Sequence, residues 1–148
     1  MNPLKALSLW QPWAWALIHA GKDVENRPWR TNYRGRLYIH AAKRKPTDDE
    51  LWSFLELFEG ANRERCHRIV PNVSSAMEYL RSVCWLGGMV GHVDLVDCVR
   101  SSGSPWGADD QWHWKIANPV AIPFVPYRGR QGLFNIDWRY VGIEGETL

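Results

Sequence analysis

The sequence predicts an α+β fold: a partly open β-barrel of about six strands with flanking helices, formed by residues 1–148 as one domain. Several short segments alternate between apolar and polar residues, which is the pattern of strands with one buried face. Glycines and prolines separate these segments, and two of the other segments begin with residues that favour the start of a helix. A chain of 148 residues is long enough to bury one hydrophobic core.

The first third of the chain is predicted to contain two strands, a short helix and an extended crossing. Residues 5–9 alternate as a strand does. Pro12 suits the first position of a helix, where its missing N–H costs nothing, and Gly21 suits the residue after its end. Residues 22–29 are expected to be extended, because they include a proline that disfavours helix in the residue before it. Residues 37–41 alternate again and form the second strand.

A capping box marks the start of the clearest helix. The Thr47 hydroxyl and the Glu50 carboxylate can each accept a hydrogen bond from a free backbone N–H of the first turn. Apolar residues follow at helical spacing, and Gly60 is expected to end the helix. Residues 63–68 are basic and polar, with no element assigned, and residues 74–82 are expected to form a second helix after the break at the preceding proline.

The C-terminal half is predicted to complete the barrel. Residues 89–99 alternate with a period of two and are partly apolar on both faces, which indicates a central strand. Residues 101–110 are rich in serine, glycine and proline and are expected to be a loop. Pro123 and Pro126 require an edge or bulged position for the strand that carries them, since proline donates no ladder hydrogen bond. Three closing strands are expected, at residues 111–117, 120–127 and 132–136.

The charge of the chain is unevenly distributed. Residues 1–45 carry nine Lys or Arg against two acidic residues, a net charge of +7, whereas the remainder carries nine against fourteen, a net charge of −5. Four of the ten tryptophans, Trp10, Trp13, Trp15 and Trp29, stand among these positive charges. Such a segment can attract phosphates at a distance and stack bases at contact. No Ser-His-Asp spacing, P-loop or dinucleotide fingerprint is present, which argues against nucleoside-triphosphate and redox chemistry.

Three ordered motifs carry a family resemblance. Residues 7–14 read Leu-Ser-Leu-Trp-Gln-Pro-Trp-Ala, residues 22–27 match Lys-x-x-Glu-x-Arg, and residues 34–40 match Arg-Gly-x-x-x-Ile-His. Together with residues 91–98 and 129–134, this order resembles the ASCH (activating signal cointegrator homology) domain. The resemblance implies a PUA-like barrel, related to modules that bind modified or structured RNA, with a cleft between the barrel and the N-terminal helix. It also implies nucleic-acid binding, although a few members resemble ribonucleases or N4-acetylcytidine amidohydrolases.

The resemblance places the candidate site on the extended crossing. In a binding site, Lys22 and Arg27 hold phosphate oxygens and Glu25 orients a guanidinium or accepts from a base amine. In a hydrolase acting on RNA or on an acylated nucleoside, Lys22 and Glu25 are the catalytic pair. Members that resemble the amidohydrolase have Thr at the position of Glu25, which weakens that assignment. Without the family resemblance, the Glu25–Arg27 pair can also be interpreted as a surface ion pair that contributes little to stability.

The full set of candidate nucleic-acid contacts extends on both sides of the crossing. For each contact a structural reading stays open: capping or packing for Gln11 and the tryptophans, and solvated charge for the exposed cations. His40 is interpreted as a satisfied core histidine, and His92 and His113 as structural. The candidate contacts are Trp10, Gln11, Trp13, Lys22, Arg27, Arg34, Arg36 and Lys43.

The expected partner is RNA or another single-stranded nucleic acid, with a modified nucleoside as one form of it. A protein partner that binds the tryptophan-rich surface is a third hypothesis. The three cysteines form no C-x-x-C pair, so neither a disulfide framework nor a metal site is expected, and no cofactor is expected either. Since neither a signal peptide nor a membrane-spanning stretch is evident, we expect the protein in the cytoplasm. We also expect it to be a monomer.

Overall fold

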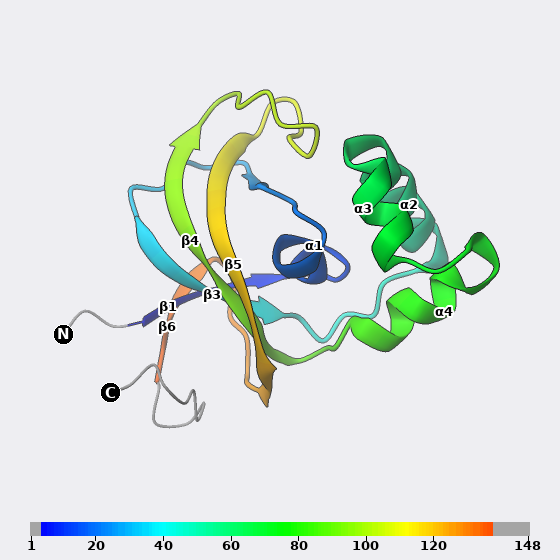
Figure 1. Cartoon of the computed structure of the whole chain (residues 1–148). Coiled ribbons are helices and arrows are strands. Elements are labelled where there is room, and N and C mark those ends of the chain that lie inside the picture. Colours follow the sequence, from blue (N-terminus) through cyan, green and yellow to red (C-terminus); the bar gives the residue numbers. More distant parts are fainter. Residues whose placement is uncertain (1–3, 138–148) are drawn as a thin grey trace.

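The computed structural model describes residues 4–137, apart from the side chain of Val73. One sheet of six strands is covered by helices, and the strand order is β2-β5-β4-β3-β1-β6 (Figure 1). The predicted α+β class and partly open barrel are confirmed, because the sheet is curved but its two edge strands, β2 and β6, are not paired with each other in the described residues. The elements are β1 (Leu4–Leu9), α1 (Trp13–His19), β2 (Val24–Arg27), β3 (Gly35–Ala41), α2 (Asp48–Ala61), α3 (Arg63–Ile69), α4 (Val73–Val83), β4 (Gly88–Val99), β5 (Trp112–Pro126) and β6 (Leu133–Ile136).

The N-terminal strand lies in the interior of the sheet. β1 pairs in parallel with β3 and antiparallel with β6, so that the first and last described strands of the chain are neighbours. In the register of the parallel pair, Leu7 lies opposite Ile39 and Ser8 lies opposite His40. Because partners in register point to the same side of a sheet, the Ser8 and His40 side chains are adjacent.

Helix α1 lies between the sheet and a separate layer formed by α2, α3 and α4 (Figure 1). Ala14, Leu17 and Ile18 pack on the sheet, where they join the apolar residues of β1 and β3. Trp15 points the other way, into the helical layer, where its ring contacts the Phe54 ring edge-on. The helix is therefore buried on two sides, which agrees with its nearly uninterrupted apolar sequence.

The helical layer confirms the predicted capping box and contains one helix that the sequence pattern does not predict. The capping box is present, with the Thr47 side chain accepting from the Glu50 backbone N–H and the Glu50 carboxylate accepting from the Thr47 backbone N–H. Residues 63–68 have no helical pattern in the sequence, but they lie in helix α3. Asn62 caps this helix by accepting from the Arg65 backbone N–H, and only Cys66 on its inner face is buried. A single buried residue per two turns leaves too weak a periodic signal to predict a helix.

The expected strands at residues 111–117 and 120–127 are one continuous strand, β5. Asn118 adopts a positive φ of 52° in the middle of it, and the register with β4 shifts at three places, so the strand bends without ending. On one side of β5, β2 pairs with residues 112–115. Beyond these residues, the strand that pairs with β5 in the described chain is β4. Pro123 and Pro126 therefore lie where one side of the strand is an edge, which confirms the position expected for them.

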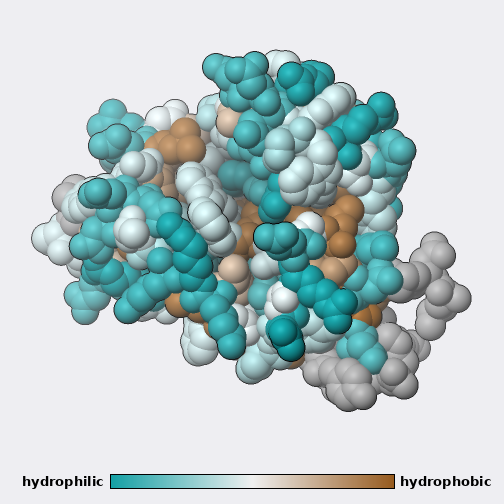
Figure 2. Space-filling model, turned by 180° about the vertical axis from the view of Figure 1, so that it is seen from behind, coloured by the Kyte–Doolittle hydropathy of each residue, from teal (hydrophilic) through white to brown (hydrophobic). Residues whose placement is uncertain are grey.

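One face of the molecule combines hydrophilic and hydrophobic areas. Seen from the side opposite to Figure 1, hydrophobic residues gather in the middle of the face, between hydrophilic margins (Figure 2). None of the described helices combines the length and the apolar character that crossing a bilayer requires. The large apolar side chains that are exposed among the described residues are Trp10, Trp29, Trp52, Trp85, Val96 and Val120.

Candidate nucleic-acid interface

A cleft of about 780 Å³ opens beside the ends of β1, β2 and β3 and the loop between β5 and β6. The charged residues that the structure describes in its lining are all positive, with no Asp or Glu among them. Ser8 and His40 lie in its wall, and backbone and small residues complete it. The cationic residues of the lining are Arg27, Lys43, Arg128 and Arg130, and the aromatic residues are Trp10, Trp29 and Tyr127.

Three of these cations have no acidic partner in the part of the chain that the structure describes. No ion pair with a described residue is formed by Lys43, Arg128 or Arg130, in contrast to Arg44 and Arg81, which pair with carboxylates of the helical layer. Among residues 4–137, therefore, no carboxylate offsets their mutual repulsion. Such a concentration of one sign of charge in a concave surface raises the local concentration of anionic ligands.

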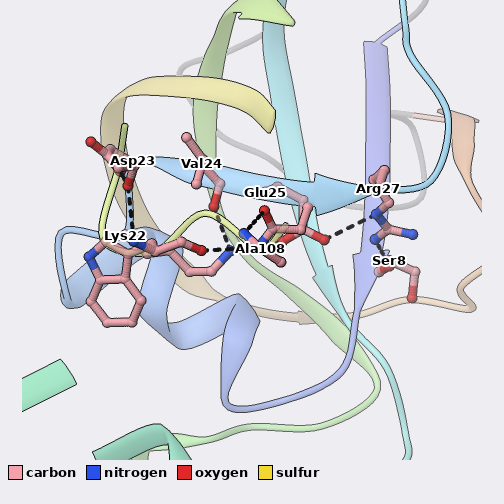
Figure 3. A network of polar contacts seen from close by, with 10 residues as sticks. Ser8, Lys22, Asp23, Val24, Glu25, Arg27 and Ala108 are labelled. Carbon is pink, nitrogen blue, oxygen red and sulfur yellow. Dashed lines mark hydrogen bonds and ion pairs between the residues drawn. The ribbon is translucent and has the colours of Figure 1, made fainter. Parts of the chain in front are cut away.

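The fourth cation, Arg27, is held in place by a buried ionic network (Figure 3). Glu25 lies between two cations: its Oε1 is 3.0 Å from Lys22 Nζ, and its Oε2 accepts from Arg27 Nε at 3.0 Å. Arg27 Nη2 also donates to the carbonyl of Ser8 on β1, at 3.1 Å. The side chains of Lys22, Glu25 and Arg27 are 3%, 10% and 17% exposed, so the network is largely removed from water. With one negative and two positive charges, it carries a net charge of +1.

Lys22 does not line the main cleft. Its ammonium group donates to the Val24 carbonyl as well as to Glu25, and it lies 5.8 Å from the centroid of the Trp13 ring. Lys22, Trp13 and Glu25 instead border a smaller cavity of about 320 Å³, next to the loop that carries Trp106. Lys22 precedes β2 rather than extending it, and the turn there lets its ammonium reach the same carboxylate as Arg27.

Gln11 and Trp13 belong to the scaffold in this structure. Gln11 is 1% exposed, its Oε1 accepts from the Trp15 backbone N–H at 2.9 Å, and its Nε2 donates to the Trp85 carbonyl at 2.9 Å. Trp13 is half-buried and packs edge-on against Phe54 with ring centroids 5.6 Å apart. These contacts match the capping and packing alternatives that the sequence left open for the two residues.

Trp10 and Trp29 are the exposed tryptophans of the cleft. Trp10 is 55% exposed, although the Arg44 guanidinium lies 4.0 Å from the centroid of its ring. Trp29 is 44% exposed and has the Arg27 guanidinium 5.6 Å from its ring centroid. Each indole therefore has aromatic surface in contact with water, as a stacking platform requires.

Arg34 and Arg36 lie away from the cleft. Both are exposed at the start of β3, where Arg34 is 3.5 Å from a carboxylate oxygen of Asp97. Lys43 follows the other end of the same strand and lines the cleft. A strand of this length separates its two ends by about 20 Å. The structure thus brings Trp10, Arg27 and Lys43 together and leaves Arg34 and Arg36 at the opposite end of β3.

Ser8 and His40 form a hydrogen-bonded pair in the cleft wall that was not among the candidates. His40 Nε2 lies 2.6 Å from the Tyr127 carbonyl, and its Nδ1 lies 3.0 Å from the Ser8 hydroxyl. Because a carbonyl only accepts, Nε2 carries the hydrogen, and in the neutral ring Nδ1 accepts from Ser8. Burial of the ring lowers the pKa of His40 below its ordinary value of 6.5. The expectation of a hydrogen-bonded core histidine agrees with this geometry.

The loop between β5 and β6 supplies cleft residues that sequence reasoning missed. Tyr127, Arg128 and Arg130 come from this loop, and Gly129 lies so close to His40 that a Cβ there would overlap the imidazole ring. One signal was available, since residues 129–134 are among the segments that carry the family resemblance. Their proximity to β1 and β3 depends on the pairing of β6 with β1, which local sequence does not show.

Comparison with known proteins identifies the class to which this fold and cleft belong. The model of the ASCH domain family matches residues 7–125, and the chain belongs to that family. The chain is 36% identical over 96 residues to activating signal cointegrator 1 of Homo sapiens, and 35% identical over 96 residues to the protein of the same name from Mus musculus. Each match covers 63% of this chain but only 14% of the relative. The family resemblance is confirmed, and the loop that carries Arg128 and Arg130 lies beyond the matched residues.

Proposed function

We propose that the protein binds RNA or another single-stranded nucleic acid in the cleft that contains Arg27. One observation carries this proposal: four cationic and three aromatic side chains surround about 780 Å³, and none of the described residues that line it is Asp or Glu. Phosphate oxygens are bound by guanidinium and ammonium groups, and bases stack on aromatic rings. A nucleic-acid partner is also what the family resemblance implies.

The roles of the individual residues follow from their positions. Lys43, Arg128 and Arg130 contact the sugar–phosphate backbone, and Arg27 offers a guanidinium whose orientation is already set by Glu25. A base that stacks on an exposed indole gains about 1–3 kcal/mol of binding free energy. The neutral Ser8–His40 pair lies between these groups and adds no charge at neutral pH.

Fluorescence anisotropy with a labelled RNA of about eight nucleotides, at increasing salt, tests the proposal. We expect log K to fall linearly with log salt concentration, with a slope of about 0.7 per phosphate neutralised. Arg128→Ala should weaken binding and reduce this slope by about 0.7. Arg63→Ala is the matched control, because it removes the same charge from the exposed surface of α3, outside the cleft. Undetectable binding, or equal effects of both substitutions, would contradict the proposal.

A second candidate function is hydrolysis of RNA or of an acylated nucleoside. The observation that favours it is the buried Lys22–Glu25 pair beside the cavity of about 320 Å³, since charged groups kept out of water at a cavity are frequent in catalytic sites. Labelled RNA and N4-acetylcytidine are incubated with the protein and with Glu25→Gln. Turnover that the substitution abolishes, in a variant that circular dichroism shows to be folded under the assay conditions, would support catalysis. The absence of turnover with both substrates would end this candidate.

A cytoplasmic location is part of the proposal. Cys66, Cys84 and Cys98 are free thiols, and burial raises the pKa of Cys84 to about 12. Unpaired thiols are typical of a reducing compartment. Mass spectrometry of the intact protein purified without reductant should find three alkylatable cysteines after unfolding.

A further inference from the structure

The cleft contains more positive charge than the internal phosphates of a strand would neutralise. A cavity of about 780 Å³ is in the size range of sites for one small ligand. It therefore accommodates about two nucleotides, and each internal phosphodiester contributes a single negative charge. Four cationic side chains line the same space. Two internal phosphates would leave about half of this charge without a counter-charge.

The network of Lys22, Glu25 and Arg27 keeps the one positive charge that Arg27 contributes to this count. Both oxygens of the Glu25 carboxylate are already occupied, so one of the two positive charges of the network has no counter-charge among residues 4–137. It is Arg27 that borders the cleft. Of the five N–H groups of its guanidinium, two are used by Glu25 and by the Ser8 carbonyl, which leaves three for a ligand in a fixed orientation. A rigid fork of this kind suits two oxygens of one phosphate group.

The other three cations come from two separate loops and converge on the same space. Lys43 follows β3, whereas Arg128 and Arg130 follow β5. In the described part of the chain none of the three is neutralised by a carboxylate. All three are exposed, and neighbouring cations of this kind attract a ligand with more than one negative charge more strongly than a ligand with one.

From this charge balance we propose that the cleft binds the phosphorylated end of a nucleic-acid strand. A terminal phosphomonoester carries a charge between about −1.5 and −2 at neutral pH and has three acceptor oxygens, whereas an internal phosphodiester has a charge of −1 and two. The adjacent Trp10 and Trp29 stack the first bases. The inference rests on the proposed function and specifies its substrate: a strand terminus rather than any internal segment.

The test compares four oligoribonucleotides of one sequence of about eight nucleotides. One has hydroxyl groups at both ends, one a 5′-phosphate, one a 3′-phosphate, and one is circular and has no ends. Competition against a labelled strand should show that one phosphorylated form binds at least about tenfold more tightly than the hydroxyl form. The circular form should bind no better than the hydroxyl form. In Arg128→Ala the preference should fall below about threefold, and in Arg63→Ala it should remain.

Two results would overturn the inference and leave nucleic-acid binding in place. One is equal, salt-dependent binding of all four forms. The other is a free nucleoside monophosphate that competes as well as the phosphorylated strand, because the site would then be for a mononucleotide. If none of the four forms binds, the proposed function itself fails, so the two failures are distinguishable.

Discussion

Replacing Glu25 with Gln tests how the buried network is held together. The substitution keeps the shape of the side chain but removes the one negative charge between Lys22 and Arg27. Lys22, with a side chain 3% exposed, then has no counter-charge, and breaking a buried pair in this way costs about 3–5 kcal/mol of unfolding free energy. We expect the full loss here, because the two cations also repel each other once the carboxylate is gone.

The comparison with Lys22→Met sharpens this prediction. That substitution removes a buried cation and leaves Glu25 paired with Arg27, so we expect a loss of only about 1–3 kcal/mol. The double variant Lys22→Met/Glu25→Gln should be more stable than Glu25→Gln alone, since the uncompensated ammonium is absent. Such non-additivity is the mark of residues in one network.

Urea unfolding followed by tryptophan fluorescence gives the free energies, with circular dichroism to check that each variant is folded. A loss within about 1 kcal/mol for Glu25→Gln would refute the reasoning, because the network would then be too well solvated to need its carboxylate. A double variant less stable than both single variants would refute it as well.

Three further predictions concern other parts of the molecule. Since burial lowers the pKa of His40, the unfolded chain takes up a proton below pH 6.5 that the folded chain resists, so unfolding free energy should fall as the pH drops below that value. His40→Gln should flatten this dependence in urea titrations at several pH values, leaving the part due to His19, whose pKa burial also lowers; an unchanged profile would exclude His40 as its source. Thr47→Ala removes half of the capping box of α2 and should cost about 1 kcal/mol in the same assay, whereas no loss would mean that the exposed cap contributes nothing. Trp10→Ala should weaken binding of a short RNA by about 1–3 kcal/mol without changing the salt slope, and a changed slope would show that the indole acts through the neighbouring charges.

Local chemistry in the sequence predicted most elements of the fold. The Pro12 and Gly21 boundaries of α1 and the capping box of α2 depend on residues a few positions apart. Helix α3 was missed because one buried cysteine does not produce a helical period. The continuity of β5 was not predicted, because Asn118 bends the strand with a positive φ and an asparagine in such a pattern indicates a turn.

The candidate site was predictable only in part, for a similar reason. Trp10, Arg27 and Lys43 stand within one basic segment, and the structure places all three in the cleft. Arg34 looks equivalent to them in sequence, but the length of β3 separates it from them. Arg128 is distant in sequence and reaches the cleft through the pairing of β6 with β1. Proximity that arises from a sheet partner far along the chain leaves no local signal.

The neighbouring positions of β1 and β6 have a consequence for the synthesis of the protein. A chain that has been made only as far as residue 125, where the family match ends, has neither β6 nor the loop that supplies Arg128 and Arg130. Its β1 has a free edge on one side, and one wall of the cleft does not exist yet. The cleft therefore cannot form before residues 126–136 have been synthesised, and a nascent chain that still lacks them does not possess it.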